Sequence, residues 1–188
     1  MLAACEAPKL DALSSADVIV AFGDSLTAGV GVNAESSYPA RLSELSGIKV
    51  INAGVSGETT SEGLVRLPQV IEEHNPGLLI LLEGGNDILQ NKSDKLIAQN
   101  LDKMIQIALE RDIQVVLIGV PEKSLFSRSA PFYRDLAEKH KLVFDANLVG
   151  NLMRSPSMKS DSVHFNKEGY TKMAEEIYAL LSDNGAFN

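Results

Sequence analysis

The sequence VIVAFGDSLTAG, at residues 18–29, joins an apolar run to a glycine, an acid and a hydroxyl group. Apolar runs without polar alternation are typical of strands that are buried on both faces of a sheet. In open α/β sheets, functional groups usually follow the carboxyl ends of the strands. We therefore predict a buried strand at residues 18–22 and a candidate nucleophile, Ser25, directly beyond it. The alternative is that Asp24 or Ser25 only caps the helix that follows.

The rest of the chain alternates strand-like and helix-like segments. Apolar segments predict strands at residues 49–53, 78–82, 114–119 and 143–145. Apolar residues at helical spacing predict helices at residues 38–45, 60–73, 93–110, 133–140 and 167–181. Strict alternation with short links implies right-handed crossovers and a parallel sheet. The predicted fold class is α/β, a three-layer α/β/α sandwich with a central parallel sheet of about five strands.

Composition limits the domain count and the partners. With 188 residues, 45% of them hydrophobic, the chain can bury one substantial core. We predict a single domain at residues 16–188 behind an N-terminal tail at residues 1–15. The net charge of −8 argues against a nucleic-acid partner, because phosphate binding needs clustered Lys and Arg. The single cysteine excludes an intrachain disulfide, and without a convincing ligand cluster we predict no metal, no cofactor and no protein partner.

The N-terminus carries a short pattern of its own. Residues 2–5, Leu-Ala-Ala-Cys, resemble the lipobox of bacterial lipoproteins, in which Cys5 would receive lipid after cleavage. The basic and long apolar regions of a signal peptide are missing, and a chance match is the alternative. On the lipoprotein interpretation, residues 6–15 tether the domain in the bacterial cell envelope, either periplasmic or lipid-anchored. The chain as given is expected to be soluble, because its apolar runs are too short to span a bilayer.

Three predicted loops gather at one edge of the sheet, because the carboxyl ends of parallel strands point the same way. They contain Ser25, then GVSGET at residues 54–59, then EGGND at residues 83–87. Acyl transfer needs a nucleophile, hydrogen-bond donors for the developing oxyanion, and a base. Gly57 can offer an unshielded backbone N–H, and Asn86 can offer an amide N–H. Taken singly, such glycine-rich turns usually only reverse the chain.

The base is expected in DSVH at residues 161–164, just before the last predicted helix. An aspartate three positions before a histidine can orient one imidazole nitrogen while the other nitrogen faces the nucleophile. We therefore predict that Asp161 and His164 act on Ser25. The other two histidines, His74 and His140, are expected to be solvated surface residues.

Together these four stretches resemble blocks I, II, III and V of the SGNH (GDSL) hydrolase family, in the family's order. The blocks are GDSL at residues 23–26, the glycine of SGET at Gly57, GGND at residues 84–87, and DSVH at residues 161–164. Within the family, the chain is most similar to the bacterial subgroup of thioesterase I, lysophospholipase L1 and arylesterase. Residues 52–59 and 63–68 follow that subgroup's pattern.

The resemblance implies a flavodoxin-like SGNH hydrolase fold and a set of site residues. Ser25 would be the nucleophile, His164 the base and Asp161 its orienting acid. The oxyanion hole would consist of the Ser25 and Gly57 backbone N–H groups and the Asn86 side chain. The implied reaction is hydrolysis of small acyl esters or thioesters through an acyl-enzyme.

Some residues depart from the family pattern. Phe165 stands where proline is common, Glu83 has no role that the pattern assigns, and residues 122–131 match the subgroup's acyl groove only loosely. Four large apolar residues either line a groove or simply pack in the core: Phe126, Phe132, Met153 and Met158.

Two other functions stay open at this point. A carbohydrate or peptidoglycan O-acetylesterase shares the chemistry but needs a polar, open site. A non-catalytic module that binds a small ligand or glycan would use the same crevice without reaction. The complete set of Ser25, Asp161 and His164 argues against the binding module.

Overall fold

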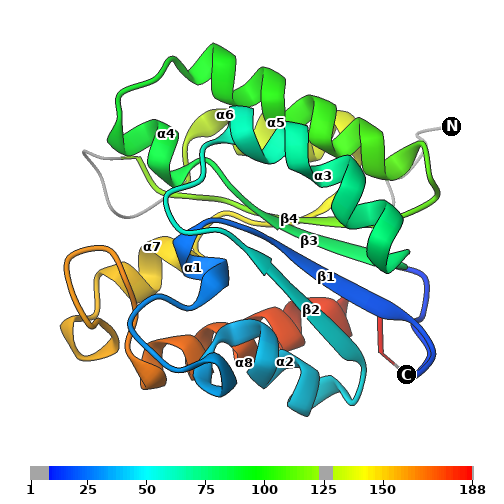
Figure 1. Ribbon diagram of the computed structural model, residues 1–188, viewed down its shortest axis with the longest axis horizontal. Coiled ribbons are helices and arrows are strands. Elements are labelled where there is room, and N and C mark those ends of the chain that lie inside the picture. The colour runs from blue at the N-terminus through cyan, green and yellow to red at the C-terminus, as the bar shows by residue number, and fades with distance from the viewer. Residues whose placement is uncertain (1–8, 123–128, 188) are drawn as a thin grey trace, which may run out of the picture.

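The computed structural model of the protein describes residues 9–122 and 129–187. A single sheet of five parallel strands runs through it in the order β2-β1-β3-β4-β5 (Figure 1). The strands are β1 (Val18–Gly23), β2 (Lys49–Gly54), β3 (Leu78–Leu82), β4 (Gln114–Ile118) and β5 (Val143–Asp145). The predicted α/β class and strand set are confirmed.

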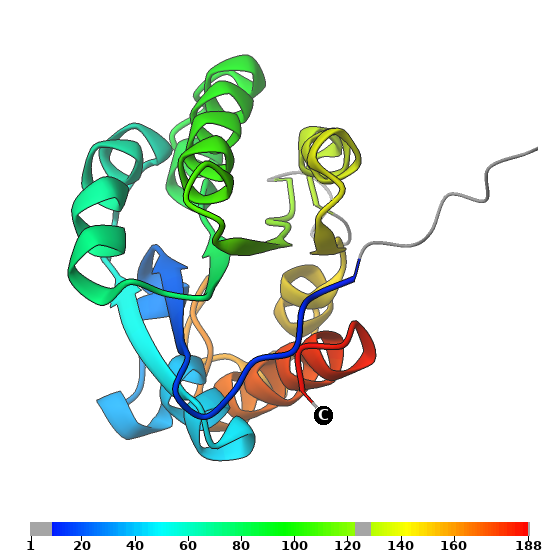
Figure 2. The ribbon, with the colours of Figure 1, turned by 90° about the vertical axis from the view of Figure 1, so that its right-hand side faces the viewer.

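Helices cover both faces of the sheet, which gives the predicted three layers (Figure 1, Figure 2). One face carries α3 (Thr60–His74), α5 (Asp94–Leu109) and α6 (Pro131–His140). The other face carries α2 (Tyr38–Ser46), α7 (Leu148–Met153) and α8 (Lys167–Asp183). The helices α2, α3, α5 and α6 each lie between two successive parallel strands, so each crossover returns the chain to the same end of the sheet.

The core lies on both sides of the three inner strands. All five residues of β3 are buried, and β1 and β4 are buried almost throughout. The edge strand β2 is only partly buried, and it accommodates the polar residues Lys49 and Asn52. The unbroken apolar runs of the sequence are therefore the inner strands, where burial of apolar area stabilises the fold by roughly 25 cal/mol per Å².

Several short helices were not predicted from the sequence. They are α1 (Ser25–Ala28), α4 (Gly85–Leu89), α7, and the 3₁₀ turns η1 (Ala34–Ser36) and η2 (Pro156–Met158). Each spans less than two helical turns, so no repeat of apolar residues can reveal it. Two of them, α1 and α4, begin directly beyond a strand at the candidate site.

The N-terminal segment docks on the domain from residue 10 onward. Leu10 N donates to Asn184 O, and Leu13 N donates to Ala186 O, both at 2.8 Å. Both leucines pack against the core. Part of the predicted tail, residues 10–14, thus lies against the folded domain rather than apart from it. Residues 1–8 lie outside the described residues, so lipid attachment at Cys5 and an envelope location stay predictions.

No helix within residues 9–122 and 129–187 combines the length and the apolar composition that crossing a bilayer requires.

Candidate active site

Ser25 lies where β1 passes into α1. Asp24 is the N-cap of α1, and its Oδ1 accepts a hydrogen bond from Leu26 N at 3.0 Å. Ser25 is the first residue of the helix and is half-buried. Gly54, at the end of the neighbouring strand, leaves room for this turn, since a Cβ there would lie 2.1 Å from Ala28 N. The two interpretations of the sequence thus hold together: Asp24 is the cap, and Ser25 presents its hydroxyl.

His164 and Asp161 meet this hydroxyl from the loop before α8. His164 Nε2 lies 3.1 Å from Ser25 Oγ, and His164 Nδ1 lies 2.7 Å from Asp161 Oδ2. Asp161 Oδ1 accepts the backbone N–H groups of Val163 and His164, both at 2.9 Å. The Val163 N–H, followed by the His164 contacts, lowers the pKa of Asp161 to about 2. The carboxylate is therefore ionised at neutral pH, and the structure brings the three predicted residues together.

Phe165, which departs from the family pattern, anchors this loop. Its side chain is fully buried, and its ring packs edge-on against Tyr170 of α8 with the centroids 5.6 Å apart. Asn166 then caps α8 by accepting the Gly169 N–H at 3.0 Å. The loop that carries His164 is thus fixed by the core on one side and by the helix on the other.

The predicted oxyanion donors line the wall that faces His164. Gly57 lies in the loop between β2 and α3 with a φ of 82°. Asn86 projects from α4, and its Nδ2 donates to Glu58 O at 2.8 Å. An amide nitrogen carries two hydrogens, so this bond orients Asn86 and leaves the second N–H for a ligand. The Ser25 N–H is the first of its helix and needs no intrahelical acceptor.

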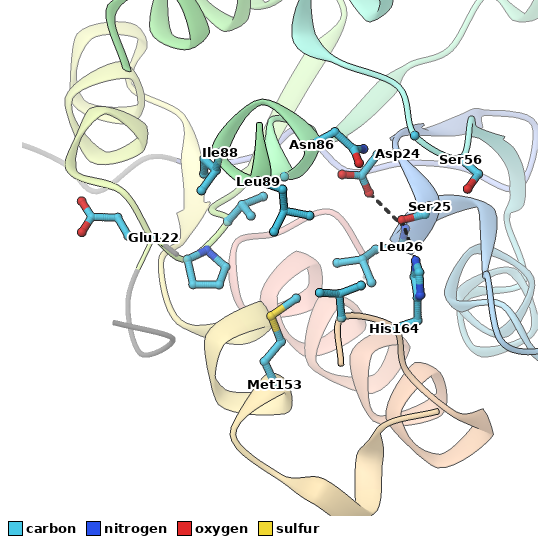
Figure 3. Close-up of a pocket in the computed structure, with 15 residues that line it drawn as sticks. Asp24, Ser25, Leu26, Ser56, Asn86, Ile88, Leu89, Glu122, Met153 and His164 are labelled. Atoms are coloured by element: carbon cyan, nitrogen blue, oxygen red, sulfur yellow. Dashed lines mark hydrogen bonds between the residues drawn. The ribbon is translucent and has the colours of Figure 1, made fainter. Parts of the chain in front are cut away.

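These groups border one cavity of about 230 Å³ (Figure 3). Ser25, His164 and Asn86 lie around one end, and Met153 and Glu122 lie toward the other. Between them the lining is mainly apolar, from Leu26, Ile88, Leu89, Val120, Pro121, Met153 and Val163. The cavity therefore joins a polar reaction end to an apolar arm.

Of the three predicted groove candidates that the structure describes, one lines this arm. Met153, at the end of α7, borders the cavity. Phe132 is buried against Tyr133, with ring centroids 4.6 Å apart, and Met158 packs against the core from η2. Phe126 lies outside the described residues.

Buried acids lie directly behind the reaction end. Asp24 and Glu83 are 4% and 0% exposed. Burial raises the pKa of Asp24 to about 6, against the opposing effects of the Leu26 N–H and His164. Burial raises the pKa of Glu83 to about 10, and the charges of Asp24 and Glu58 add to the effect. Glu83 is therefore a neutral acid at neutral pH.

Sequence reasoning missed the role of Glu58 and Arg66. Arg66 Nε and Nη2 donate to the two carboxylate oxygens of Glu58 at 2.7 and 2.6 Å. The guanidinium also stacks on Phe22, 4.1 Å from the ring centroid, and donates to Ala53 O. A separation of eight residues across a loop and a helix has no local rule that predicts a pair. The pair fixes the loop in which Gly57 lies.

The expectation that His140 is a solvated surface residue is wrong. Its side chain is only 12% exposed, and its Nε2 lies 2.6 Å from Asp102 Oδ1. The packing of α6 on α5 places Asp102 beside it. His74 is also partly covered, with 26% of its side chain exposed.

Across the ranges 9–122 and 129–187, no group of three His, Cys, Asp or Glu residues is arranged to hold a metal ion.

Known proteins match the chain over most of its length. Residues 21–172 match the model of the family described as "GDSL-like Lipase/Acylhydrolase family". An arylesterase of Vibrio mimicus is 31% identical over 177 residues, which cover 88% of this chain and 88% of that protein. The thioesterase 1/protease 1/lysophospholipase L1 of Escherichia coli strain K12 is 28% identical over 174 residues, or 86% of this chain and 82% of that protein.

One solved structure is also similar to the chain over most of its length. The SGNH-hydrolase family esterase AlinE4 is 33% identical, with a TM-score of 0.71 over 92% of this chain and 96% of that chain. The family match runs from before Ser25 to beyond His164, so it includes every candidate site residue.

Proposed function

The chain belongs to the GDSL-like lipase/acylhydrolase family and is an ester hydrolase, and from this premise we propose that it cleaves acyl esters and thioesters with a Ser25-His164-Asp161 triad. The observation that carries the proposal is the 3.1 Å approach of His164 Nε2 to Ser25 Oγ at the polar end of the cavity. The reaction passes through an acyl-enzyme on Ser25.

In the first half-reaction, Ser25 Oγ attacks the substrate carbonyl while neutral His164 takes its proton. Asp161 holds the imidazole through Nδ1 and stabilises the imidazolium that forms. His164 then gives the proton to the departing alcohol or thiol as the ester or thioester bond breaks. The acyl group stays on Ser25.

Three donors stabilise the negative oxygen that develops on the carbonyl. They are the backbone N–H groups of Ser25 and Gly57 and the Nδ2 of Asn86. Each donor contributes about 3 kcal/mol to the transition state, because it is held in place before the charge appears.

In the second half-reaction, water replaces the leaving group. His164 takes a proton from water as the water oxygen attacks the acyl carbonyl, and the ester bond to Ser25 breaks. The proton returns to Ser25 Oγ, and the carboxylic acid leaves. Ser25, His164, the substrate and one water molecule thus account for every proton that moves.

The apolar arm of the cavity supports an acyl chain as the part of the substrate that is bound. Leu26, Ile88 and Met153 can cover methylene groups, each worth about 0.8 kcal/mol when buried. A glycan O-acetylesterase needs a polar, open site for the sugar, and the lining here is mainly apolar. The similarity to an arylesterase and to a thioesterase 1/lysophospholipase L1 supports the same substrate class.

Rates on a chain-length series test this proposal. Wild type and Ser25→Ala are compared on p-nitrophenyl acetate, butyrate and octanoate, on octanoyl-coenzyme A, and on acetylated xylan. We expect kcat/KM to rise from acetate to octanoate, and kcat of Ser25→Ala to fall by ~10⁴-fold or more. Wild-type rates in Ser25→Ala would reject the triad. Turnover of acetylated xylan alone would make the enzyme an O-acetylesterase.

A further inference from the structure

Glu83 is a fully buried acid that the reaction described above does not use. It follows β3 directly, and its Oε2 accepts the Gly84 N–H at 3.0 Å. Its Oε1 is also buried, and within the described part of the chain no donor reaches it. A buried carboxylate oxygen without a donor lowers the stability of the fold, and protonation of Glu83 removes the unpaired negative charge.

The acceptor for that proton is the carboxylate of Glu58. A methyl group on Gly63 of α3 would lie 3.4 Å from both Glu58 Oε2 and Glu83 Oε1, so the two oxygens border the same small space. Since no donor of the described residues reaches Glu83 Oε1, a proton on Glu83 would satisfy this oxygen by bridging it to Glu58. Because Arg66 already donates twice to Glu58, Glu58 is the charged partner and Glu83 the donor.

Within residues 9–122 and 129–187, Glu83 forms no ion pair with a Lys, Arg or His side chain. Asp24 faces it from the turn after β1, and the charge of Asp24 disfavours ionisation of Glu83. From α6, the Tyr133 hydroxyl donates to the Glu83 backbone oxygen at 2.6 Å and not to its carboxyl group. Asp87 of α4 is the next buried acid, and it takes its hydrogen bonds from Thr60. Burial of the side chain, together with the charge of Asp24, raises the pKa of Glu83 to about 10.

Glu58 connects Glu83 to the oxyanion donors. Its carbonyl oxygen accepts the Asn86 Nδ2–H at 2.8 Å. Its backbone N–H donates to Val55 O at 3.2 Å, which closes the turn around Gly57. A displacement of Glu58 therefore moves both Gly57 and Asn86.

We propose that Glu83 is a positioning residue of this hydrolase: as a neutral acid it donates a hydrogen bond to Glu58 and so holds Gly57 and Asn86 in place for the oxyanion. The inference rests on the proposed function, because it assigns those two groups to the oxyanion hole. Loss of the Glu83 proton would place a third carboxylate beside those of Asp24 and Glu58, of which Glu58 is paired with Arg66. The donors would then shift, so kcat would fall while KM would change little, because the oxyanion exists only in the transition state.

Two variants at position 83 separate positioning from mere stability. Glu83→Gln places an amide N–H where the acid carries its proton and cannot ionise. Glu83→Leu removes the donor at similar size. The matched control is Ile80→Val, a buried change without a polar group in β3, the strand that precedes Glu83. For each protein, kcat and KM on p-nitrophenyl butyrate are measured from pH 6 to pH 10, together with the melting temperature.

We expect Glu83→Gln to keep the wild-type kcat at pH 7 and to hold it at pH 10, where wild type declines. Between pH 6 and 8, Glu83→Leu should lose on the order of tenfold in kcat relative to wild type, with KM within about twofold, because displacing the donors costs less than removing them. Ile80→Val should lower the melting temperature and leave the wild-type pH profile intact.

The inference is overturned if Glu83→Leu retains wild-type kcat, or if Glu83→Gln declines at pH 10 as wild type does. Should Glu83→Leu fail to fold, the Glu83→Gln profile decides alone. The proposed function fails separately, through wild-type rates in Ser25→Ala, which no result at position 83 can imitate.

Discussion

His164 Nε2 lies 3.1 Å from Ser25 Oγ, although 139 positions separate the two residues in the chain. Ser25 begins α1 directly after β1, and His164 lies in the loop before α8. The Tyr170 hydroxyl of α8 donates to Val30 O at 2.9 Å and ties the helix to the segment that follows α1. The geometry of the pair therefore depends on how α8 docks against the start of the chain.

Asp161→Asn should lower kcat less than loss of a buried triad acid does. The Asp161 side chain is 53% exposed, so water can replace part of its effect on His164. We expect a loss of roughly 10- to 10³-fold, compared with ~10⁴-fold where the aspartate is buried. The measurement is kcat on p-nitrophenyl butyrate, with Asp183→Asn, at the exposed end of α8, as the control. Wild-type kcat in Asp161→Asn would mean that the carboxylate does not orient His164.

The ionisation of Asp161 should not shape the pH profile in the assay range. Its pKa of about 2 lies below the ordinary value of 3.8, because the Val163 N–H and the His164 contacts favour the charged form. Any effect of this group on folding is therefore present above pH 3.8 and lost only as the pH falls through about 2. A wild-type profile of kcat/KM from pH 4 to 8 should carry no inflection that Asp161→Asn removes. An inflection that disappears in Asp161→Asn would contradict this assignment.

Asn86→Ala should act on kcat and hardly on KM. Removal of one oxyanion donor lowers kcat by ~10²- to 10³-fold, because the donor acts on charge that is absent from the bound substrate. The variant also leaves Glu58 O without the Nδ2–H it accepts. Gln90→Ala, an exposed change just beyond the same short helix, is the control and should retain wild-type kinetics. A raised KM at unchanged kcat would assign Asn86 to substrate binding instead.

The sequence predicted two parts of the site: the groups that follow strand ends, and the Asp161–His164 pair, whose spacing before the last helix is visible in the sequence. Ser25, Gly57 and Asn86 each follow an apolar run, and parallel topology brings those ends to one edge. The Glu58–Arg66 pair and the buried position of Glu83 were not predictable, because they arise from packing of α3 over the sheet. Of the apolar arm, Met153 was among the candidates from the sequence, but Leu26 and Val120 were not, because the lining comes from three separate segments without a common periodicity.

Met153→Trp should shorten the acyl chains that the enzyme accepts. Met153 lines the apolar arm, and a larger ring there removes space for the distal methylene groups. We expect kcat/KM on p-nitrophenyl octanoate to fall by about tenfold or more, with the value on acetate within about threefold, since each methylene group lost from the pocket costs roughly 1–3 kcal/mol. Leu45→Trp, on the exposed face of α2, is the control. Equal losses on both esters would show that the arm does not hold the acyl chain.

Stability should fall as the pH rises, and Glu83 should account for much of the fall. The folded pKa of Glu83 is raised from 4.5 to about 10, so the native state binds more protons than the unfolded state between these values. The contribution to stability is complete below pH 4.5 and is lost toward pH 10. Asp24 adds a smaller effect of the same sign, between pH 3.8 and about 6.

Urea unfolding of wild type and Glu83→Gln between pH 6 and 9 measures this effect. Wild type should lose stability relative to Glu83→Gln, by about 1 kcal/mol or more across the range, because the amide cannot titrate. Glu110→Gln, an exposed change at the end of α5, controls for loss of a surface charge. Parallel curves for wild type and Glu83→Gln would contradict a protonated Glu83 in the native state.

The identity of the nucleophile can be measured without any assumption about the substrate. A fluorophosphonate forms a phosphorus–oxygen bond to an activated serine as fluoride leaves, and intact-mass spectrometry followed by peptide mapping locates the adduct. We predict one adduct per chain, on Ser25, with ester hydrolysis lost in proportion to labelling and no adduct in Ser25→Ala. An adduct on another residue, or full hydrolysis by a protein labelled completely at Ser25, would contradict the acyl-enzyme mechanism.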